Sequence, residues 1–183
     1  MRKLQGFTDE GSPGRDWNVA TGMVIEGKAG FQIMGDWAKG EFTAAGKVPG
    51  VDYYCAATPS NNGYLYNVDS FIFYKSSDPD KQAGQKLLAK LMMGKNFQKV
   101  FNLYKGSIPA RLDVSMDEFD KCAKTSNADI KTAGASGGLV PSFAHGMAQG
   151  NTMKAALQDI ITEHFNSDMS SVDAANALSL IHI

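Results

Sequence analysis

The side chains best suited to bind a small molecule occur at breaks between the helices and strands that the sequence predicts. They are Trp17, Asp36, Trp37, Asp69, Lys105 and His145. Binding groups concentrate at such junctions because the backbone reaches the surface there. An indole ring can stack on the C–H face of a polyol, while charged groups hydrogen-bond with its hydroxyls. These residue types therefore indicate a site for a neutral polyol.

Several of these residues also have an ordinary structural interpretation. Trp37 could be a core tryptophan, Asp69 the cap of a turn, and Lys105 a solvated charge in a loop. An enzyme is a second alternative, because Asp36, Glu41 and Asp69 include the carboxylate pair that a glycoside hydrolase uses. A structural domain without a ligand is the third alternative.

Neither the histidines nor the cysteines have the spacing of metal ligands. His145, His164 and His182 form no ligand pattern, and Cys55 and Cys122 lie too far apart in sequence for a zinc site. The zinc-protease pattern H-E-x-x-H, the P-loop and G-x-G-x-x-G are absent. We therefore expect no metal and no cofactor. The cysteines are either two buried thiols or one disulfide, which requires an oxidising compartment.

Composition argues against some classes of partner. The 183 residues carry 18 basic and 19 acidic side chains, so the net charge of -1 offers no global field for nucleic acid or an anionic membrane. No apolar run approaches the roughly 20 residues that span a bilayer, and no secretion signal opens the chain. Residues 1–15 begin without a predicted element, and residues 178–183 read as a non-native tail. We therefore expect the chain to be a fragment.

The elements that must position the site begin with a helix and a strand. Asp16 is a plausible N-cap for a helix that Gly27 ends. The segment "FQIMGDWAKGEF" follows, and its apolar residues predict a strand over 29–35 that ends in Gly-Asp-Trp. Such an end delivers a carboxylate and an aromatic ring to one edge of a sheet.

The central part of the chain predicts a hairpin, a strand and two helices. Asn62-Gly63 is a hairpin-type turn, and Val68 to Phe73 predicts a strand. Asp78-Pro79 opens the clearest helix, which Gly94 separates from a second helix around Phe97–Phe101.

A loop and several helices complete the chain. The segment "YKGSIPARLD" reads as a loop because it contains proline. Later helices are predicted over 116–124, over 152–165 and after a cap at Ser171, with a loop over "TAGASGGLVPS". Strands that alternate with helices indicate the α/β class.

Five segments together resemble a known family. They are "VIEGKAGFQIMGDWAKGEF", "VDSFIFYKSSDPDKQAGQKLLAKLM", "YKGSIPARLD", "FDKCA" and "SFAHGMA". The pattern is similar to periplasmic sugar-binding proteins of ABC transporters, in the extracellular solute-binding family, and most similar to the glucose or mannose type. The resemblance covers about residues 16–177 and corresponds to the carboxy-terminal part of that family's chain.

The resemblance assigns roles to the candidate residues. Trp37 would stack on the sugar ring, and Asp69, Lys105 and His145 would hydrogen-bond its hydroxyls. Trp17 and Asp36 would belong to the same site. The periplasmic resemblance, together with the presence of only two cysteines, also predicts a disulfide.

The resemblance implies an α/β fold of the periplasmic-binding-protein type with two lobes. Residues 1–63 and 112–177 would build the carboxy-terminal lobe, and residues 66–108 would cross over to the amino-terminal lobe. Leu87, Leu91 and Phe97 would then leave an exposed apolar surface in this chain.

The function that follows is non-enzymatic. The protein would capture a monosaccharide such as glucose in the periplasm by closing its two lobes, and deliver it to an ABC permease in the membrane. It would bind no nucleic acid and would be a monomer when full length.

Overall fold

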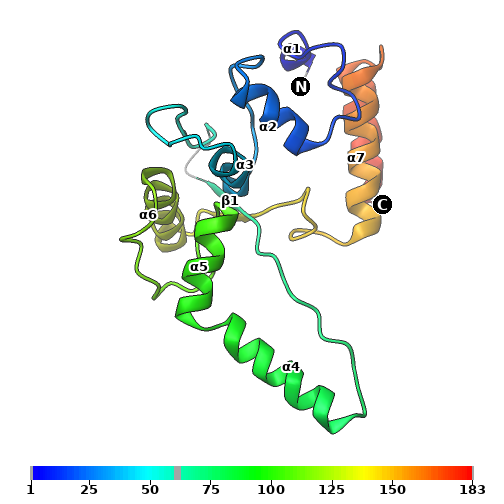
Figure 1. Ribbon diagram of the computed structural model, residues 1–183. Coiled ribbons are helices and arrows are strands. Elements are labelled where there is room, and N and C mark those ends of the chain that lie inside the picture. The colour runs from blue at the N-terminus through cyan, green and yellow to red at the C-terminus, as the bar shows by residue number, and fades with distance from the viewer. Residues whose placement is uncertain (1, 60–62, 183) are drawn as a thin grey trace. The chain divides into compact units, whose positions relative to one another are not determined.

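The computed structural model describes residues 2–59 and 63–182, and its elements are mostly helices (Figure 1). The helices are α1 Arg2–Gln5, α2 Trp17–Ile25, α3 Lys39–Ala44, α4 Pro79–Met92, α5 Lys95–Lys105, α6 Lys121–Ser136, α7 Asn151–Asn166 and α8 Ser171–Ser179. The 3-10 helices are η1 Asp36–Ala38 and η2 Leu180–His182, and the strands are β1 Tyr64–Tyr66 and β2 Leu139–Pro141.

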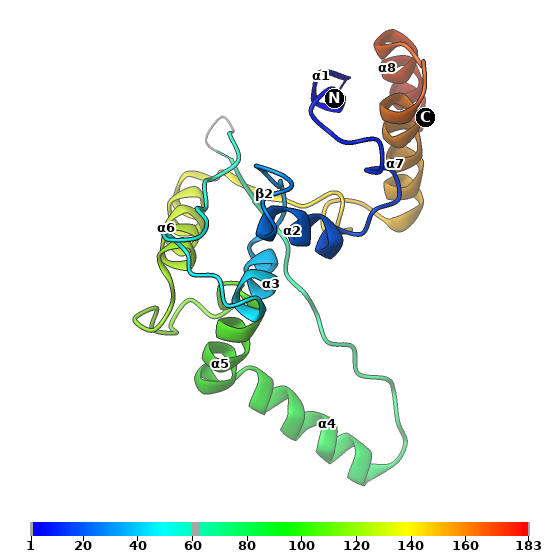
Figure 2. The same ribbon diagram turned by 45° about the horizontal axis from the view of Figure 1, so that its top comes forward.

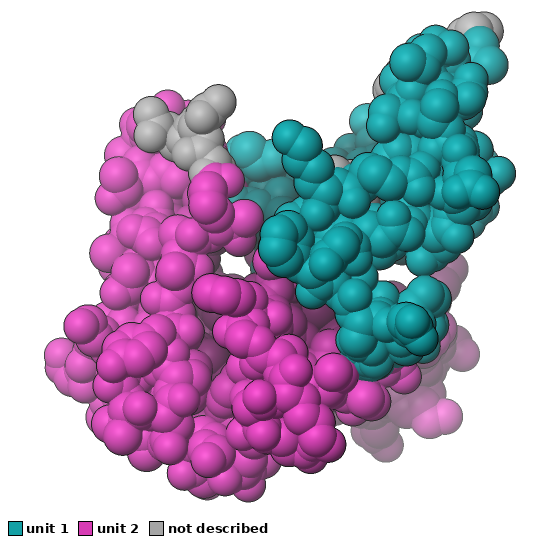
Figure 3. Space-filling model, turned by 90° about the horizontal axis from the view of Figure 1, so that it is seen from above, with its two compact units in different colours: residues 1–15, 65–67, 139–183 teal, residues 16–64, 68–138 magenta. Residues whose placement is uncertain are grey.

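The chain divides into two compact units, coloured separately in Figure 3. Unit 1 comprises residues 1–15, 65–67 and 139–183, and unit 2 comprises residues 16–64 and 68–138. Unit 2 contains the helices α2 to α6, so it holds most of the residues considered below.

Local capping chemistry explains the helices that the sequence predicted. The Asp78 carboxylate accepts hydrogen bonds from the backbone N–H groups of Asp80 and Lys81 at 2.9 and 3.3 Å, and proline opens α4 directly after it. Gly94 caps the start of α5, and Gly106 ends it in the left-handed region at φ 86°. The two consecutive helices are confirmed (Figure 2).

The predictions for the carboxy-terminal helices are confirmed in outline and corrected at some ends. α7 has nearly the predicted bounds, and α8 begins at Ser171 with Ser170 rather than Ser171 as its N-cap. The helix expected over 116–124 instead begins at Lys121, because the Asp120 carboxylate accepts the Ala123 N–H at 2.8 Å. It then continues to Ser136, through part of the segment expected to be a loop.

Two predicted strands are wrong. Residues 29–35 and 68–73 form no strand in this structure. An apolar run becomes a strand only where a neighbouring segment pairs with its backbone. Phe31 is instead 96% exposed, so this apolar residue is not buried in a sheet.

In the described residues, the sheet is a two-stranded pairing of β1 with β2. The backbone N–H of Ser142 donates to the carbonyl of Tyr66 at 2.8 Å beside it. The fold is therefore a helix-rich α/β structure. Asn62 of the expected Asn-Gly turn lies outside the described residues.

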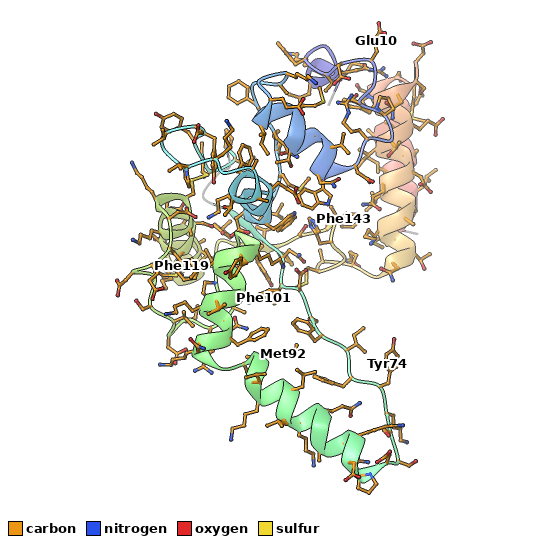
Figure 4. The ribbon with its side chains drawn as sticks, in the orientation of Figure 1. Glu10, Tyr74, Met92, Phe101, Phe119 and Phe143 are labelled. Carbon is orange, nitrogen blue, oxygen red and sulfur yellow. A yellow bond between two sulfur atoms is a disulfide. The ribbon has the colours of Figure 1, made fainter. Side chains whose placement is uncertain are left out.

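The core of unit 2 joins α6 to the end of α5. Val114, Phe119 and Ala123 form its buried centre, and Leu103 and Ile108 pack against them with Met116. Phe119 is labelled in Figure 4. This cluster attaches the loop after α5 to the first turn of α6.

The predicted disulfide is confirmed. Cys55 and Cys122 are bonded, with their Cα atoms 5.7 Å apart and 67 positions between them in sequence. Closing a loop of this length stabilises a fold by about 2–4 kcal/mol. The bond connects the first turn of α6 to the segment that contains Cys55.

A broad apolar surface extends over residues 71–104 of unit 2. Leu87 and Leu91 are 70% and 59% exposed, as predicted, whereas Phe97 is half-buried. The segment that contains Tyr74 is held to α4 by the Gln85 side chain, which donates to the Tyr74 carbonyl at 2.8 Å (Figure 4). The exposed residues of this surface also include Phe71, Ile72, Phe73, Leu88, Val100, Phe101 and Tyr104.

Candidate functional site

Trp37 is presented by the short helix η1, directly after an extended segment. Gly35 adopts an extended backbone before η1, and the indole ring of Trp37 folds back over it. A Cβ atom at position 35 would overlap that ring, so a larger residue there would displace the indole. The half-buried ring therefore has a defined orientation set by its own local backbone.

The Asp36 carboxylate connects η1 to the loop after α5. Its Oδ2 accepts the backbone N–H of Ile108 at 3.1 Å, and Ser107 adds a side-chain hydrogen bond. Burial raises the pKa of Asp36, while the charges of Lys39 and Lys105 and both hydrogen bonds favour the ionised form. The carboxylate therefore already holds backbone and side-chain partners within the protein.

Two glycines allow α3 to approach the end of α5 very closely. A Cβ at Gly106 would lie 2.7 Å from the backbone nitrogen of Gly40 and 3.0 Å from the Cβ of Lys39. A Cβ at Gly40 would lie 2.9 Å from the carbonyl oxygen of Lys105. These contacts place the Trp37 segment and Lys105 on one packed junction.

Lys105 and Asp69, both predicted site residues, form an ion pair. The Asp69 side chain is 61% exposed and that of Lys105 is 29% exposed, so the carboxylate is the more accessible partner. The Lys105 ammonium also lies 5.8 Å from the centroid of the Phe101 ring, which stacks on Phe97.

An apolar hollow lies beside this ion pair on α5. Its volume is about 510 Å³, and it is lined by Phe97, Val100, Phe101, Tyr104 and Lys105. Figure 4 labels Phe101 on this helix. An apolar wall next to an acid and a base is the combination that a polyol requires.

The sequence did not reveal an ion pair that joins α3 to the start of α6. Lys39 is only 6% exposed, and its ammonium lies 2.8 Å from Oδ2 of Asp120. Burial opposes the charge on Asp120, but hydrogen bonds from Lys39 and the Ala123 N–H outweigh it and lower the pKa of Asp120. The N-cap position of Asp120 could have been recognised from sequence, but its pairing with Lys39 could not.

Tyr64 is a second residue that the sequence did not single out. Its hydroxyl lies 2.6 Å from Oγ of Ser126. Burial raises the pKa of Tyr64, and the negative charges of Asp36 and Asp129 raise it further. Tyr64 thus adds a polar aromatic group to the surroundings of Asp36.

Trp17 opens α2 and is 40% exposed. Its carbonyl oxygen accepts hydrogen bonds from Oγ1 of Thr21 at 2.9 Å and from Nε2 of Gln32 at 2.8 Å. The amide of Gln32 therefore attaches the extended segment before η1 to α2. The role of Trp17 in ligand binding stays a prediction.

His145 belongs to unit 1, so its approach to the residues of unit 2 stays a prediction. Its Nδ1 lies 2.6 Å from Oγ of Ser142, which is 2% exposed. The Ser142 carbonyl also accepts the N–H of Met147 at 2.9 Å. These contacts hold the imidazole on a short turn after β2.

A serine pattern that the sequence reading overlooked carries no catalytic geometry. "GASGG", residues 134–138, matches the G-x-S-x-G of hydrolases. Ser136 lies in the last turn of α6 instead of a strand-to-helix turn, and its hydroxyl is bonded to the carbonyl of Thr132 at 3.2 Å.

The described residues contain neither a metal-binding cluster nor a helix suited to cross a membrane. No group of three or more His, Cys, Asp or Glu side chains in residues 2–59 and 63–182 could hold a metal ion. Within the same ranges, no helix has the length and apolarity needed to cross a membrane.

The chain belongs to the bacterial extracellular solute-binding protein family, whose model matches residues 1–132. Over 179 residues it is 47% identical to a probable sugar-binding periplasmic protein of Brucella suis and 44% identical to one of Rhizobium meliloti. These matches cover 97% of this chain but 42% and 43% of the relatives. A Pyrococcus horikoshii protein named an uncharacterized ABC transporter extracellular-binding protein is 34% identical over 162 residues, covering 88% of this chain and 35% of that protein.

The chain therefore spans about two fifths of the length of the Brucella and Rhizobium relatives. The family assignment agrees with the resemblance found in the sequence.

Proposed function

We propose that this protein is the sugar-binding component of an ABC importer and acts in the periplasm. The observation that carries the proposal is the 47% identity, over 97% of this chain, to a relative named as a sugar-binding periplasmic protein. The protein binds its sugar between two lobes and delivers it to a membrane permease. It acts as a monomer and without catalysis.

The proposed site uses Trp37 as the platform for the sugar ring. The ion pair of Asp69 and Lys105 supplies the polar contacts, because a hydroxyl can donate to the carboxylate and accept from the ammonium at once. The neighbouring apolar hollow on α5 suits the C–H faces of the ring. His145, Trp17 and Asp36 complete the proposed site.

The proposed ligand is a monosaccharide, with glucose as the first candidate. A hexose exposes several hydroxyls around a compact ring, which matches one aromatic platform with a few charged partners. We do not propose the glycoside hydrolase alternative based on Asp36, Glu41 and Asp69, because Asp36 already holds hydrogen bonds to Ile108 and Ser107 and Asp69 is paired with Lys105.

We also propose the division into lobes stated above. Residues 1–63 and 112–177 belong to the carboxy-terminal lobe, residues 66–108 cross over, and residues 178–183 are a non-native tail. The exposed apolar surface over residues 71–104 supports the crossover, since such a surface is normally covered by another part of a protein.

Titration calorimetry with glucose on the intact protein tests the function. Trp37→Ala should weaken glucose binding more than tenfold, or about 1.4 kcal/mol, because the stacking platform is lost. Asp69→Ala should weaken it by leaving hydroxyl donors without an acceptor.

Matched controls are Tyr54→Ala, an aromatic residue that is 84% exposed, and Asp113→Ala, which removes another ion-paired acid. Both should bind glucose as the wild type does. Unchanged affinity in the two site variants would place the site elsewhere. Release of nitrophenol from a nitrophenyl glucoside would show an enzyme instead.

A further inference from the structure

Lys39 is an exception among the lysines, because its side chain is 7% exposed and forms an ion pair with Asp120. Lysine is almost never buried unless it is paired. A buried pair also contributes little net stability, because the loss of hydration offsets the attraction between the charges. Stability alone therefore gives a weak reason for a lysine at this position.

The partner of Lys39 is one of the most firmly held points of unit 2. Asp120 caps α6 through the Ala123 N–H, and Ala123 is 0% exposed in the core. Cys122 in the same turn is bonded to Cys55. Three independent constraints (a cap, a core contact and a disulfide) thus fix the end of α6 that Lys39 reaches.

Lys39 is also adjacent to residues of the candidate sugar site. It opens α3 two positions after Trp37, with no break between η1 and α3. Its Cβ faces the backbone of Gly106, next to Lys105. The charge of Lys39 also acts on the Asp36 carboxylate, which holds the Ile108 N–H.

We infer that Lys39 is a positioning residue for the sugar site. Its ion pair with Asp120 attaches η1 to the firmly held start of α6, and this attachment keeps Trp37 in place relative to Lys105 at the end of α5. This inference rests on the proposed function for its ligand. The position of Trp37, however, can be measured without any sugar. The pair joins residues 81 positions apart, so it sets a distance that local structure does not.

The test uses the intact protein labelled with 5-fluorotryptophan, in which the Trp37 resonance is identified by its loss in Trp37→Phe. Lys39→Met keeps most of the side-chain volume and removes the charge. We expect the fluorine resonance of Trp37 to shift or broaden, and glucose affinity to fall by about tenfold or more. Lys28→Met is the control, because Lys28 is exposed and paired only with exposed Glu26. It should change neither measurement.

A second variant separates positioning from simple loss of stability. Asp120→Asn retains an N-cap side chain, so Lys39→Met combined with Asp120→Asn leaves no unpaired buried charge. The double variant should recover stability relative to Lys39→Met, while the Trp37 resonance and the weakened glucose affinity persist. If stability, the Trp37 resonance and glucose affinity all recovered in the double variant, Lys39 would have a merely structural role and the inference would be overturned.

The two proposals fail in different ways. A wild-type protein that binds no glucose, combined with a displaced Trp37 resonance in Lys39→Met, would refute the proposed ligand and support the positioning role. An unchanged Trp37 resonance in Lys39→Met would refute the positioning role whatever the sugar result.

Discussion

The charge of Lys39 acts on both Asp36 and Asp120, but the surroundings of these two carboxyls move their pKa values in opposite directions. Burial raises the pKa of Asp36 in spite of two nearby lysines. Burial opposes ionisation of Asp120 too, but the direct hydrogen bond from Lys39 and the cap to α6 lower its pKa. Burial is the dominant effect on Asp36, whereas Asp120 is less buried and accepts a direct hydrogen bond from Lys39 at 2.8 Å.

Stability should therefore respond to pH with opposite signs at the two residues. A carboxyl with a raised folded pKa stabilises the fold below its ordinary pKa of about 3.9, and loses that contribution as the pH rises through the folded value. The wild type should thus gain stability relative to Asp36→Asn as the pH falls from about 7 to about 4. Urea unfolding of both proteins at each pH measures this difference.

Asp120→Asn supplies the opposite case. In the wild type, the lowered pKa of Asp120 stabilises the fold at pH values above the ordinary carboxyl pKa. This contribution is lost as the pH falls through the pKa that Asp120 has in the folded protein. The wild type should therefore lose stability relative to Asp120→Asn when the pH falls below about 4. Slopes of the same sign in the two comparisons would contradict the assignment of causes.

At the scale of elements, the junction of α3 with α5 depends on two residues without side chains. Gly106 has φ 86° and faces the backbone of Gly40 and the Cβ of Lys39. Glycine here ends α5 and also permits a backbone contact that no other residue would fit. The same residue therefore connects a helix end to the placement of Lys105.

Gly106→Ala should destabilise the protein by about 2–4 kcal/mol, because a left-handed conformation costs about 1–2 kcal/mol and the added methyl group overlaps α3. Gly46→Ala is the matched control, since Gly46 has φ 70° but open space around its Cα. Gly46→Ala should lose only the stability that corresponds to the cost of the left-handed conformation. Equal losses in thermal or urea unfolding would show that the close packing of α3 and α5 contributes nothing.

For the whole molecule, the notable feature is that the apolar surface over residues 71–104 is not covered by other residues in the described part of this chain. Leu87 and Leu91 are both more than half exposed, on a helix whose cap and end are well formed. A surface of this kind agrees with the proposal that residues 66–108 pack against a further lobe.

Leu87→Asp in the intact protein tests that proposal. If another lobe covers Leu87, the substitution buries a charge and should cost about 2 kcal/mol or more in the free energy of unfolding. Val172→Asp is the control, because Val172 is 68% exposed on α8 and should tolerate the change. A loss no larger than that of the control would show that Leu87 is exposed to solvent in the intact protein.

The features that depend on neighbouring residues could be predicted from the sequence. Asp78 and Pro79 open α4, and Gly94 and Gly106 bound α5, because caps and breaks act within one turn. The family pattern also predicted Asp69 and Lys105 as site residues, and the structure shows that the two form an ion pair.

The features that join distant segments depend on tertiary packing and could not be predicted from the sequence. The runs at 29–35 and 68–73 have strand-like sequences but no strand, since a strand forms only where another segment supplies its hydrogen bonds. Asp36 reaches the N–H of Ile108 across 72 positions, and Lys39 reaches Asp120 across 81. No local pattern specifies such partners, because their distance depends on how α3, α5 and α6 pack.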